Sequence, residues 1–335
     1  MSDIAGHQSL PDLVSAGERR AYAPQLGALA AAVTWALASG SVFLRDDIGD
    51  WGRTREYGLV IAAASLLLAG AALAAPLHEP ASRKLRYWSP WLAALGLALA
   101  AWELVTAKFA VLPQPFFPPP QALLEVFTDD FAKLGESTVA SIKLHATGYL
   151  IGAAVGFLTG VSIGWSRIAG YWVHPILRFV GPLPATAWLP LAFFAFPSSW
   201  SASIFLIALA AAFPVTILTW SGVAAVPAAY YDVARTLGAS RTFLVTKVAV
   251  PAALPHVFVG LFMGLGSSFA VLVVAELLGV KAGLGWYLQW AQGWASYANM
   301  YAALIVLSLL CSTLITMLFR LRDRTLGWQK GLVKW

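Results

Sequence analysis

Residues 202–223 read ASIFLIALAAAFPVTILTWSGV, an uncharged run of mostly apolar side chains. A helix needs about 20 such residues to cross the ~30 Å hydrocarbon core of a bilayer, so this run predicts a transmembrane helix. Seven further runs of the same kind predict spans over residues 26–44, 57–77, 88–104, 146–165, 171–196, 257–278 and 301–319. We therefore expect an all-α integral membrane protein with about eight transmembrane helices.

The composition and the charge pattern support this class. Of the 335 residues, 59% are hydrophobic and only 11% are charged, whereas roughly a quarter are charged in a soluble domain. The net charge is +6, but the cations lie between apolar runs, which favours a topological role over binding to nucleic acid. With eight spans, most of the 22 Lys and Arg residues, Arg167 and Arg178 among them, fall on the side of both termini. The positive-inside rule then predicts cytoplasmic termini.

The fifth predicted span, 171–196, is interrupted by Gly181, Pro182, Pro184 and Pro190. Proline lacks the N–H that a helix needs, so this span should be kinked or partly unwound. Such breaks are tolerated in a membrane only where protein or water satisfies the freed backbone groups. We expect the fifth span to face other helices or a pathway.

Two longer stretches are predicted on the external side. Residues 106–137 are rich in proline and contain an amphipathic segment at 122–131. Residues 279–300 carry Trp286, Trp290 and Trp294 at helical spacing. This pattern is typical of an interfacial helix at the membrane surface, and a docking surface for a soluble partner is the alternative.

The loop between spans six and seven reads PAAYYDVARTLGASRTFLVTKVAVPAALP over residues 227–255. Gly238 can supply the left-handed residue that ends a first helix, and Ser240 can cap a second helix. The second helix is expected to end at Pro251. The loop is too polar for lipid and too structured for a tether, which indicates a surface that another protein binds.

This loop resembles the conserved cytoplasmic loop of ABC importer permeases. Residues 232–234 stand at its Glu-Ala-Ala positions, Gly238 at its glycine, and 250–251 at its terminal apolar–Pro step. Segments 182–196, 203–215 and 271–279 extend the resemblance over about 102–328, to the branch that imports sulfonates, taurine and nitrate. The residues that the resemblance assigns to coupling with an ATPase are Asp232, Ala234, Arg235, Gly238, Ala239, Ser240 and Pro251.

The resemblance implies a six-helix type I importer core over residues 88–335, with its coupling loop at 224–255. Residues 1–87 would be a cytoplasmic tail and two added spans. The implied partners are a second permease copy, two cytoplasmic ABC ATPase subunits, an external solute-binding protein and a small anionic solute, in a bacterial inner membrane. The sequence has no G-x-x-x-x-G-K-[ST] phosphate loop. We therefore expect a transport subunit without catalytic, cofactor or metal sites, with ATP and Mg²⁺ bound by the partner ATPase.

Two acids lie within the predicted spans, Glu103 and Glu276. Because charge is costly in hydrocarbon, each is expected either to snorkel or pair with a cation, such as Lys108 or Lys281, or to act in a gate or pathway. Ser267 and Ser268 lie beside glycines, which allows close helix packing. They could instead line the conduit, so the pathway candidates are Ser267, Ser268 and Glu276.

Two other functions remain open at this stage. In an ion-coupled secondary transporter, one of the two buried acids would carry the proton, but such transporters are typically built from inverted repeats and the sequence shows no such similarity. A membrane scaffold without a conduit is the other, and the broken fifth span argues against it.

Overall fold

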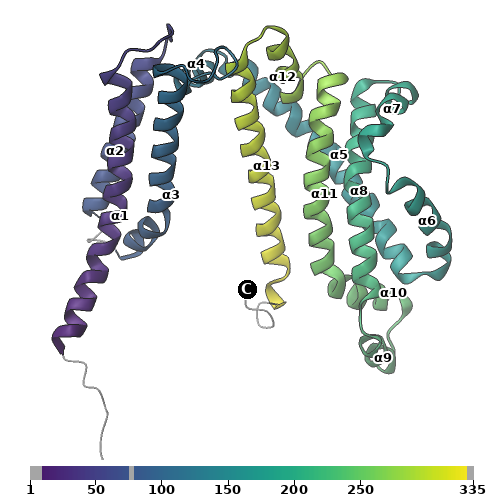
Figure 1. The fold of residues 1–335 in the computed structure, drawn as a ribbon. Helices are drawn as coiled ribbons and strands as arrows, with labels where there is room; N and C mark the ends of the chain where they lie inside the picture. Colours follow the sequence, from purple (N-terminus) through teal and green to yellow (C-terminus); the bar gives the residue numbers. More distant parts are fainter. Residues whose placement is uncertain (1–9, 75–78, 330–335) are drawn as a thin grey trace, which may run out of the picture. The chain divides into compact units, whose positions relative to one another are not determined.

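The computed structural model describes residues 10–74 and 79–329, and its regular elements there are helical (Figure 1). In chain order they are α1 (Leu10–Leu44), α2 (Thr54–Ala74), α3 (Glu79–Glu103), α4 (Pro120–Asp129), α5 (Phe131–Trp165), α6 (Arg167–Val180), α7 (Leu189–Ala195), α8 (Ser199–Ala224), α9 (Ala228–Thr236), α10 (Arg241–Phe243), α11 (Val250–Leu278), α12 (Leu284–Gly293) and α13 (Tyr297–Thr325). Two π-helical segments, Leu104–Lys108 and Leu244–Ala249, and two 3₁₀ turns, Ala185–Trp188 and Gly327–Gln329, complete the set.

Within these ranges, seven helical segments are long and apolar enough to cross a membrane. The pair Arg167–Val180 and Ala185–Ala195 becomes an eighth span if the two are taken together, and it is bent by 86° at the break. The predicted all-α membrane fold and the interruption of the fifth span are therefore confirmed. The freed backbone lies at Gly181–Pro184, where the sequence places its helix breakers.

The fourth span differs most from its predicted bounds, because α5 begins at Phe131 rather than near residue 146. Three of the polar side chains in the segment before residue 146 are buried, whereas Glu136 and Lys143 are exposed. Ser137, Ser141 and His145 are almost inaccessible to solvent. They lie on a face of α5 that is packed against protein, so they carry no cost of exposure to lipid.

The described chain forms two compact units, and each is considered by itself. One comprises the residues up to Asp130 together with Ala295–Tyr301, and the other comprises Phe131–Trp294 and the residues from Ala302 onward. The division expected at residue 88 separated α3 from the first two spans, whereas α3 packs with them in the first unit. The functional division of the chain at residue 88 stays a prediction.

In the first unit, α1 packs against both α2 and α3. Its few polar side chains find partners across these contacts. The Ser39 hydroxyl donates to the Gly58 carbonyl at 3.1 Å, and the Trp35 indole donates to the Leu92 carbonyl at 2.8 Å. The polar residues of the first two spans therefore serve helix packing within this unit.

In the second unit, α5 and α8 pack closely along a row of glycines at four-residue spacing. A Cβ atom built on Gly156 would lie 2.6 Å from the Ala212 carbonyl oxygen, and one on Gly160 would lie 2.6 Å from the Thr219 Cβ. Both distances are shorter than real Cβ contacts, so only glycine permits this approach. On the other side of α8, Gly264 of α11 approaches Ala211 in the same way.

We expect Gly156→Ala to destabilise this unit by about 1–3 kcal/mol, because the new methyl group meets a backbone oxygen that cannot move aside. Gly135→Ala is the matched control in the same helix, since a Cβ there meets no atom within 4 Å. Thermal unfolding of the purified chain measures both. Equal unfolding midpoints for the two variants would contradict the packing argument.

Candidate functional site

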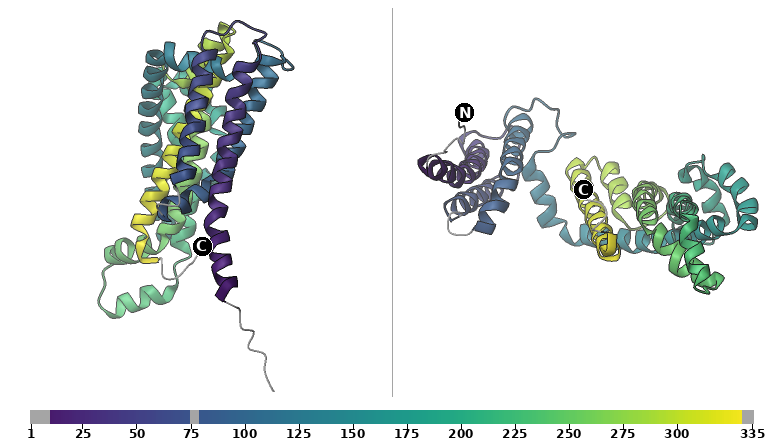
Figure 2. Two further views of the ribbon diagram at one scale, coloured as in Figure 1. Left: turned by 90° about the vertical axis from the view of Figure 1, so that its left-hand side faces the viewer. Right: turned by 90° about the horizontal axis from the view of Figure 1, so that it is seen from below.

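The loop between α8 and α11 has the predicted helix–glycine–helix geometry (Figures 1 and 2). Gly238 has a φ of +81°, a conformation that glycine adopts without strain. Its N–H donates to the Arg235 carbonyl, and the Ala239 N–H donates to the Ala234 carbonyl, at 2.9 and 3.0 Å. This pair of bonds is a Schellman motif, which ends α9 at this point. The Ser240 hydroxyl caps α10 by accepting from the Phe243 N–H at 3.3 Å.

One face of α9 is an exposed apolar surface. No residue of this helix is buried. Tyr230, Val233 and Leu237 repeat at helical spacing, and the Leu237 side chain is 82% exposed. Asp232 and Arg235 form an ion pair at 3.3 Å beside them. That pair is open to solvent and so contributes little stability.

The other face of α9 is attached to the helical bundle through Tyr231. Its ring lies edge-on to the Trp165 ring at the end of α5, with centroids 5.7 Å apart. It also packs against a cluster that includes Val223 of α8 and Ala253 of α11. Burial there raises the pKa of the Tyr231 phenol. The sequence showed only the helical spacing of Tyr231, so its role as the anchor of α9 emerges from the structure.

The second helix does not end at Pro251, contrary to the prediction. Residues Arg241–Leu278 form one continuous span through α10, a π-helical segment and α11. The π-helical segment, Leu244–Ala249, changes the hydrogen-bond register just before Pro251. A proline, which has no N–H to donate, is therefore accommodated without a break. As a result, the Gly238 elbow is followed directly by a helix that crosses the bundle.

The two candidate pathway serines differ in environment. The Ser268 hydroxyl is fully buried and lies 2.9 Å from both the His145 Nε2 and the Leu265 carbonyl oxygen. Ser267 is only partly buried and donates to the Ala210 carbonyl at 2.9 Å. It also lines a cavity of about 860 Å³, bounded mainly by α5, α6, α8 and α11. Ser268 thus has the surroundings of a packing residue, and Ser267 those of a lining residue.

Glu276 does not pair with Lys281 and does not snorkel, because it is fully buried. Its Oε1 accepts from the Ser141 hydroxyl at 2.7 Å, and its Oε2 accepts from the Gly285 N–H at 2.8 Å. Ser141 in turn accepts from the Leu284 N–H at 2.8 Å. The two side chains together satisfy the first N–H groups of α12, a favourable position for a negative charge.

The helix α12 forms at the predicted tryptophan-rich stretch and packs against other helices of the second unit. Its place at the membrane surface stays a prediction. Leu284, Tyr287 and Ala291 are fully buried and belong to the helix that contacts α5 and α11. The rings of Trp286 and Trp290 both lie beside the Lys133 ammonium, whereas Trp294 is 75% exposed.

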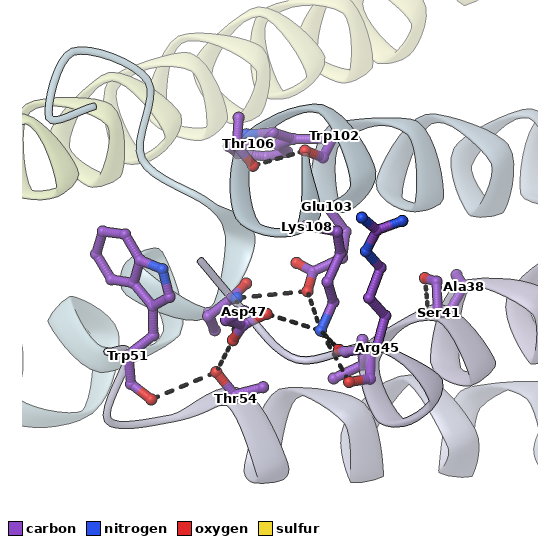
Figure 3. A network of polar contacts seen from close by, with 12 residues as sticks. Ala38, Ser41, Arg45, Asp47, Trp51, Thr54, Trp102, Glu103, Thr106 and Lys108 are labelled. Atoms are coloured by element: carbon purple, nitrogen blue, oxygen red, sulfur yellow. Dashed lines mark hydrogen bonds and ion pairs between the residues drawn. The ribbon is translucent and has the colours of Figure 1, made fainter. Parts of the chain in front are cut away.

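Glu103 and Lys108 pair within the first unit, in a buried network (Figure 3). The Lys108 ammonium lies 3.6 Å from Glu103 Oε1 and 2.7 Å from Asp47 Oδ1, and it donates to the carbonyls of Val42 and Arg45. Gln121 donates to both carboxylates, at 3.3 and 3.4 Å. The predicted pair is confirmed, and Asp47, which lies between α1 and α2, is the third member of this ionic cluster.

We expect Glu276→Gln to lower the free energy of unfolding by about 1–3 kcal/mol, because one carboxylate oxygen that accepts a buried hydrogen bond becomes a donor. Glu136→Gln on α5, where the side chain is exposed, is the matched control. Denaturant unfolding of the purified variants tests this. Equal stability of both variants would show that the charge at α12 is dispensable.

Lys108→Met should cost more, about 3–5 kcal/mol, because it leaves two carboxylates buried without their cation. Lys84→Met removes an exposed lysine from α3 and is the control. Adding Asp47→Asn and Glu103→Gln to Lys108→Met should recover much of the loss. The yield and unfolding midpoint of the purified chains are the measurements, and failure of the triple variant to recover would contradict the electrostatic explanation.

Residues 152–327 match the family described as the binding-protein-dependent transport system inner membrane component. The chain belongs to this family. It is thus a permease subunit of a binding-protein-dependent ABC importer, and the ion-coupled transporter is not favoured.

Known relatives agree with this assignment. A probable ABC transporter permease protein of Brucella abortus is 31% identical over 71% of this chain and 95% of its own length. The nitrate import permease protein NrtB of Synechococcus elongatus is 29% identical over 61% of this chain and 77% of its own. The bicarbonate transport system permease protein CmpB of the same organism is 35% identical over 45% and 55%. A chain of the inward-facing MetNI methionine ABC transporter has a similar fold, with a TM-score of 0.50 at 17% identity, covering 59% of this chain and 98% of that one.

Proposed function

We propose that this permease imports a small inorganic or organic anion, of the class that includes nitrate, bicarbonate, sulfonates and taurine. Two of its relatives are named as nitrate and bicarbonate permeases. The chain would work in a bacterial inner membrane as a pair with a second copy. A solute-binding protein outside would deliver the anion, and two cytoplasmic ABC ATPase subunits would supply the energy, with ATP and Mg²⁺ bound there.

The energy-coupling part of this proposal rests on the two different faces of α9, one exposed and one packed against the helical bundle. Its exposed face of Tyr230, Val233 and Leu237 is the surface that we assign to the ATPase. Apolar side chains outside the membrane favour a protein partner that covers them. Its opposite face holds α5 and α8 through Tyr231. The charge pattern of the loops supports cytoplasmic placement of α9 and of both termini.

Movement of the ATPase would reach the spans by two routes. One route runs from α9 through Tyr231 to Trp165, the last residue of α5. The other runs from the Gly238 elbow into the continuous helix Arg241–Leu278. Asp232, Ala234, Arg235, Ala239, Ser240 and Pro251 shape the elbow or its flanks, and we assign all of them to coupling. Ser267 is the strongest pathway candidate of the three, since Ser268 and Glu276 are fully buried in packing contacts.

We expect Gly238→Pro to uncouple ATP hydrolysis from uptake or to prevent binding of the ATPase. Proline is confined to negative φ and has no N–H, so it can neither adopt +81° nor donate to Arg235. Gly238→Asn is the control, because asparagine tolerates the left-handed conformation.

The measurement is labelled nitrate or bicarbonate uptake, together with ATP hydrolysis, in proteoliposomes. These contain the permease with the ATPase and binding protein encoded beside it. Normal ATP-driven uptake by Gly238→Pro would contradict the coupling role. Uptake of neither anion by the unmodified complex, with hydrolysis intact, would exclude these two as cargo.

A further inference from the structure

A second cavity, of about 1180 Å³, lies between α6, the end of α5 and α8. Seven residues of α6 line it, and the four with polar side chains are Arg167, Tyr171, His174 and Arg178. Their spacing is i, i+4, i+7 and i+11, so they form a single stripe along one face of the helix. Two cations and an imidazole therefore face the same space.

The opposite wall of this cavity is aromatic and apolar. It includes Trp165 of α5 and Phe213, Ile217 and Trp220 of α8. The His174 ring lies edge-on to the Trp220 ring, with centroids 4.5 Å apart. The space is an open groove, with a cationic stripe on one side and an apolar wall on the other, and a charge beside an apolar wall attracts an anion more strongly than the same charge surrounded by water.

Arg178 occupies an unusual place for a cation in this chain. It lies in the last turn of α6, just before the break in the bent span. Three residues further on, Gly181 is so close to the Phe213 ring that a Cβ atom would collide with it, and Phe213 lies near the middle of α8. Arg178 thus lies within the depth of the helices, whereas a charge that only sets topology lies beyond their ends.

Within the described residues, neither Arg178 nor Arg167 forms an ion pair or a side-chain hydrogen bond. A charged group at membrane depth is costly unless it meets water, a counter-charge or a ligand. The two acids within the predicted spans, Glu103 and Glu276, have partners other than these arginines: Lys108 for Glu103, and the Gly285 N–H for Glu276. Arg178 is exposed, so its guanidinium donors are accessible to a negatively charged partner from outside the chain.

We propose that this cavity is an oxyanion-binding site, with Arg178 and His174 as its principal donors and Arg167 at its rim. A guanidinium presents paired N–H groups that match two oxygens of one planar or tetrahedral oxyanion. The oxygens can come from a free anion such as nitrate, bicarbonate or sulfate, or from the phosphate of a phospholipid headgroup. If a free anion binds, the transported anion occupies this site after it leaves the bent span, and that assignment rests on the proposed function.

The test uses the full chain in nanodiscs of phosphatidylcholine, without ATPase or binding protein. Nitrate, bicarbonate and sulfate are titrated at constant ionic strength in gluconate, and tryptophan fluorescence is followed. Trp220→Phe supplies the background signal. We expect Arg178→Gln to weaken binding at least about tenfold, since a hydrogen bond to a charged group is lost, and Arg178→Lys to retain part of it. Arg320→Gln, which removes an exposed arginine outside the cavity, should bind as the unmodified chain does.

A second arm distinguishes the source of the anion. Nanodiscs that also contain phosphatidylglycerol are analysed by native mass spectrometry for retained lipid. Loss of retained phosphatidylglycerol in Arg178→Gln, without an effect on free anions, assigns the site to a headgroup. The proposal is overturned if Arg178→Gln changes neither free-anion binding nor lipid retention while its unfolding midpoint matches that of Arg320→Gln. Because no arm measures transport, this outcome is independent of whether the complex imports an anion.

Discussion

In the hydrocarbon of a bilayer, a polar group without a partner costs several kcal/mol, and no water is present to supply one. This constraint accounts for much of the local structure. A helix satisfies most of its own backbone, and many of the serines and threonines bond to carbonyls of the same or a neighbouring helix, as Ser267 does with Ala210. The start of α12 is the demanding case, since its first N–H groups are buried. Glu276 and Ser141, from two other helices, accept the hydrogen bonds of these N–H groups.

The same constraint makes close backbone packing useful. Apolar side chains gain nothing by leaving lipid for protein, so the contact between α5 and α8 depends on van der Waals fit. The glycines at 148, 152, 156 and 160 bring the two backbones together over much of their length. A pair packed this tightly moves as one body. Motion within the second unit is therefore expected at the elbow at Gly238 and at the break between α6 and α7, where the backbone is irregular.

The sequence predicted those features that depend on local chemistry. Hydropathy located the spans, prolines located the break at 181–184, and a glycine that needs positive φ located the end of α9. The sequence did not predict the features that depend on contacts between residues far apart in the chain. The polar first half of α5 looked like a loop, because its burial depends on helices far away in sequence. Lys281 seemed the natural partner of Glu276, yet Ser141 and Gly285 take that place. Pro251 looked like a helix end, because a π-helical segment leaves no signature in hydropathy.

One residue connects the proposed coupling surface with the proposed anion site. Trp165 ends α5, contacts Tyr231 of α9 on one side and lines the cavity with Arg178 on the other. On the proposed mechanism, an ATPase that pulls on α9 displaces this ring, since nothing flexible separates the two contacts. The cavity wall opposite Arg178 then moves as the nucleotide state changes, and the affinity of the site for an oxyanion changes with it. By linkage, an anion held at Arg178 would bias the position of α9 by an equal free energy.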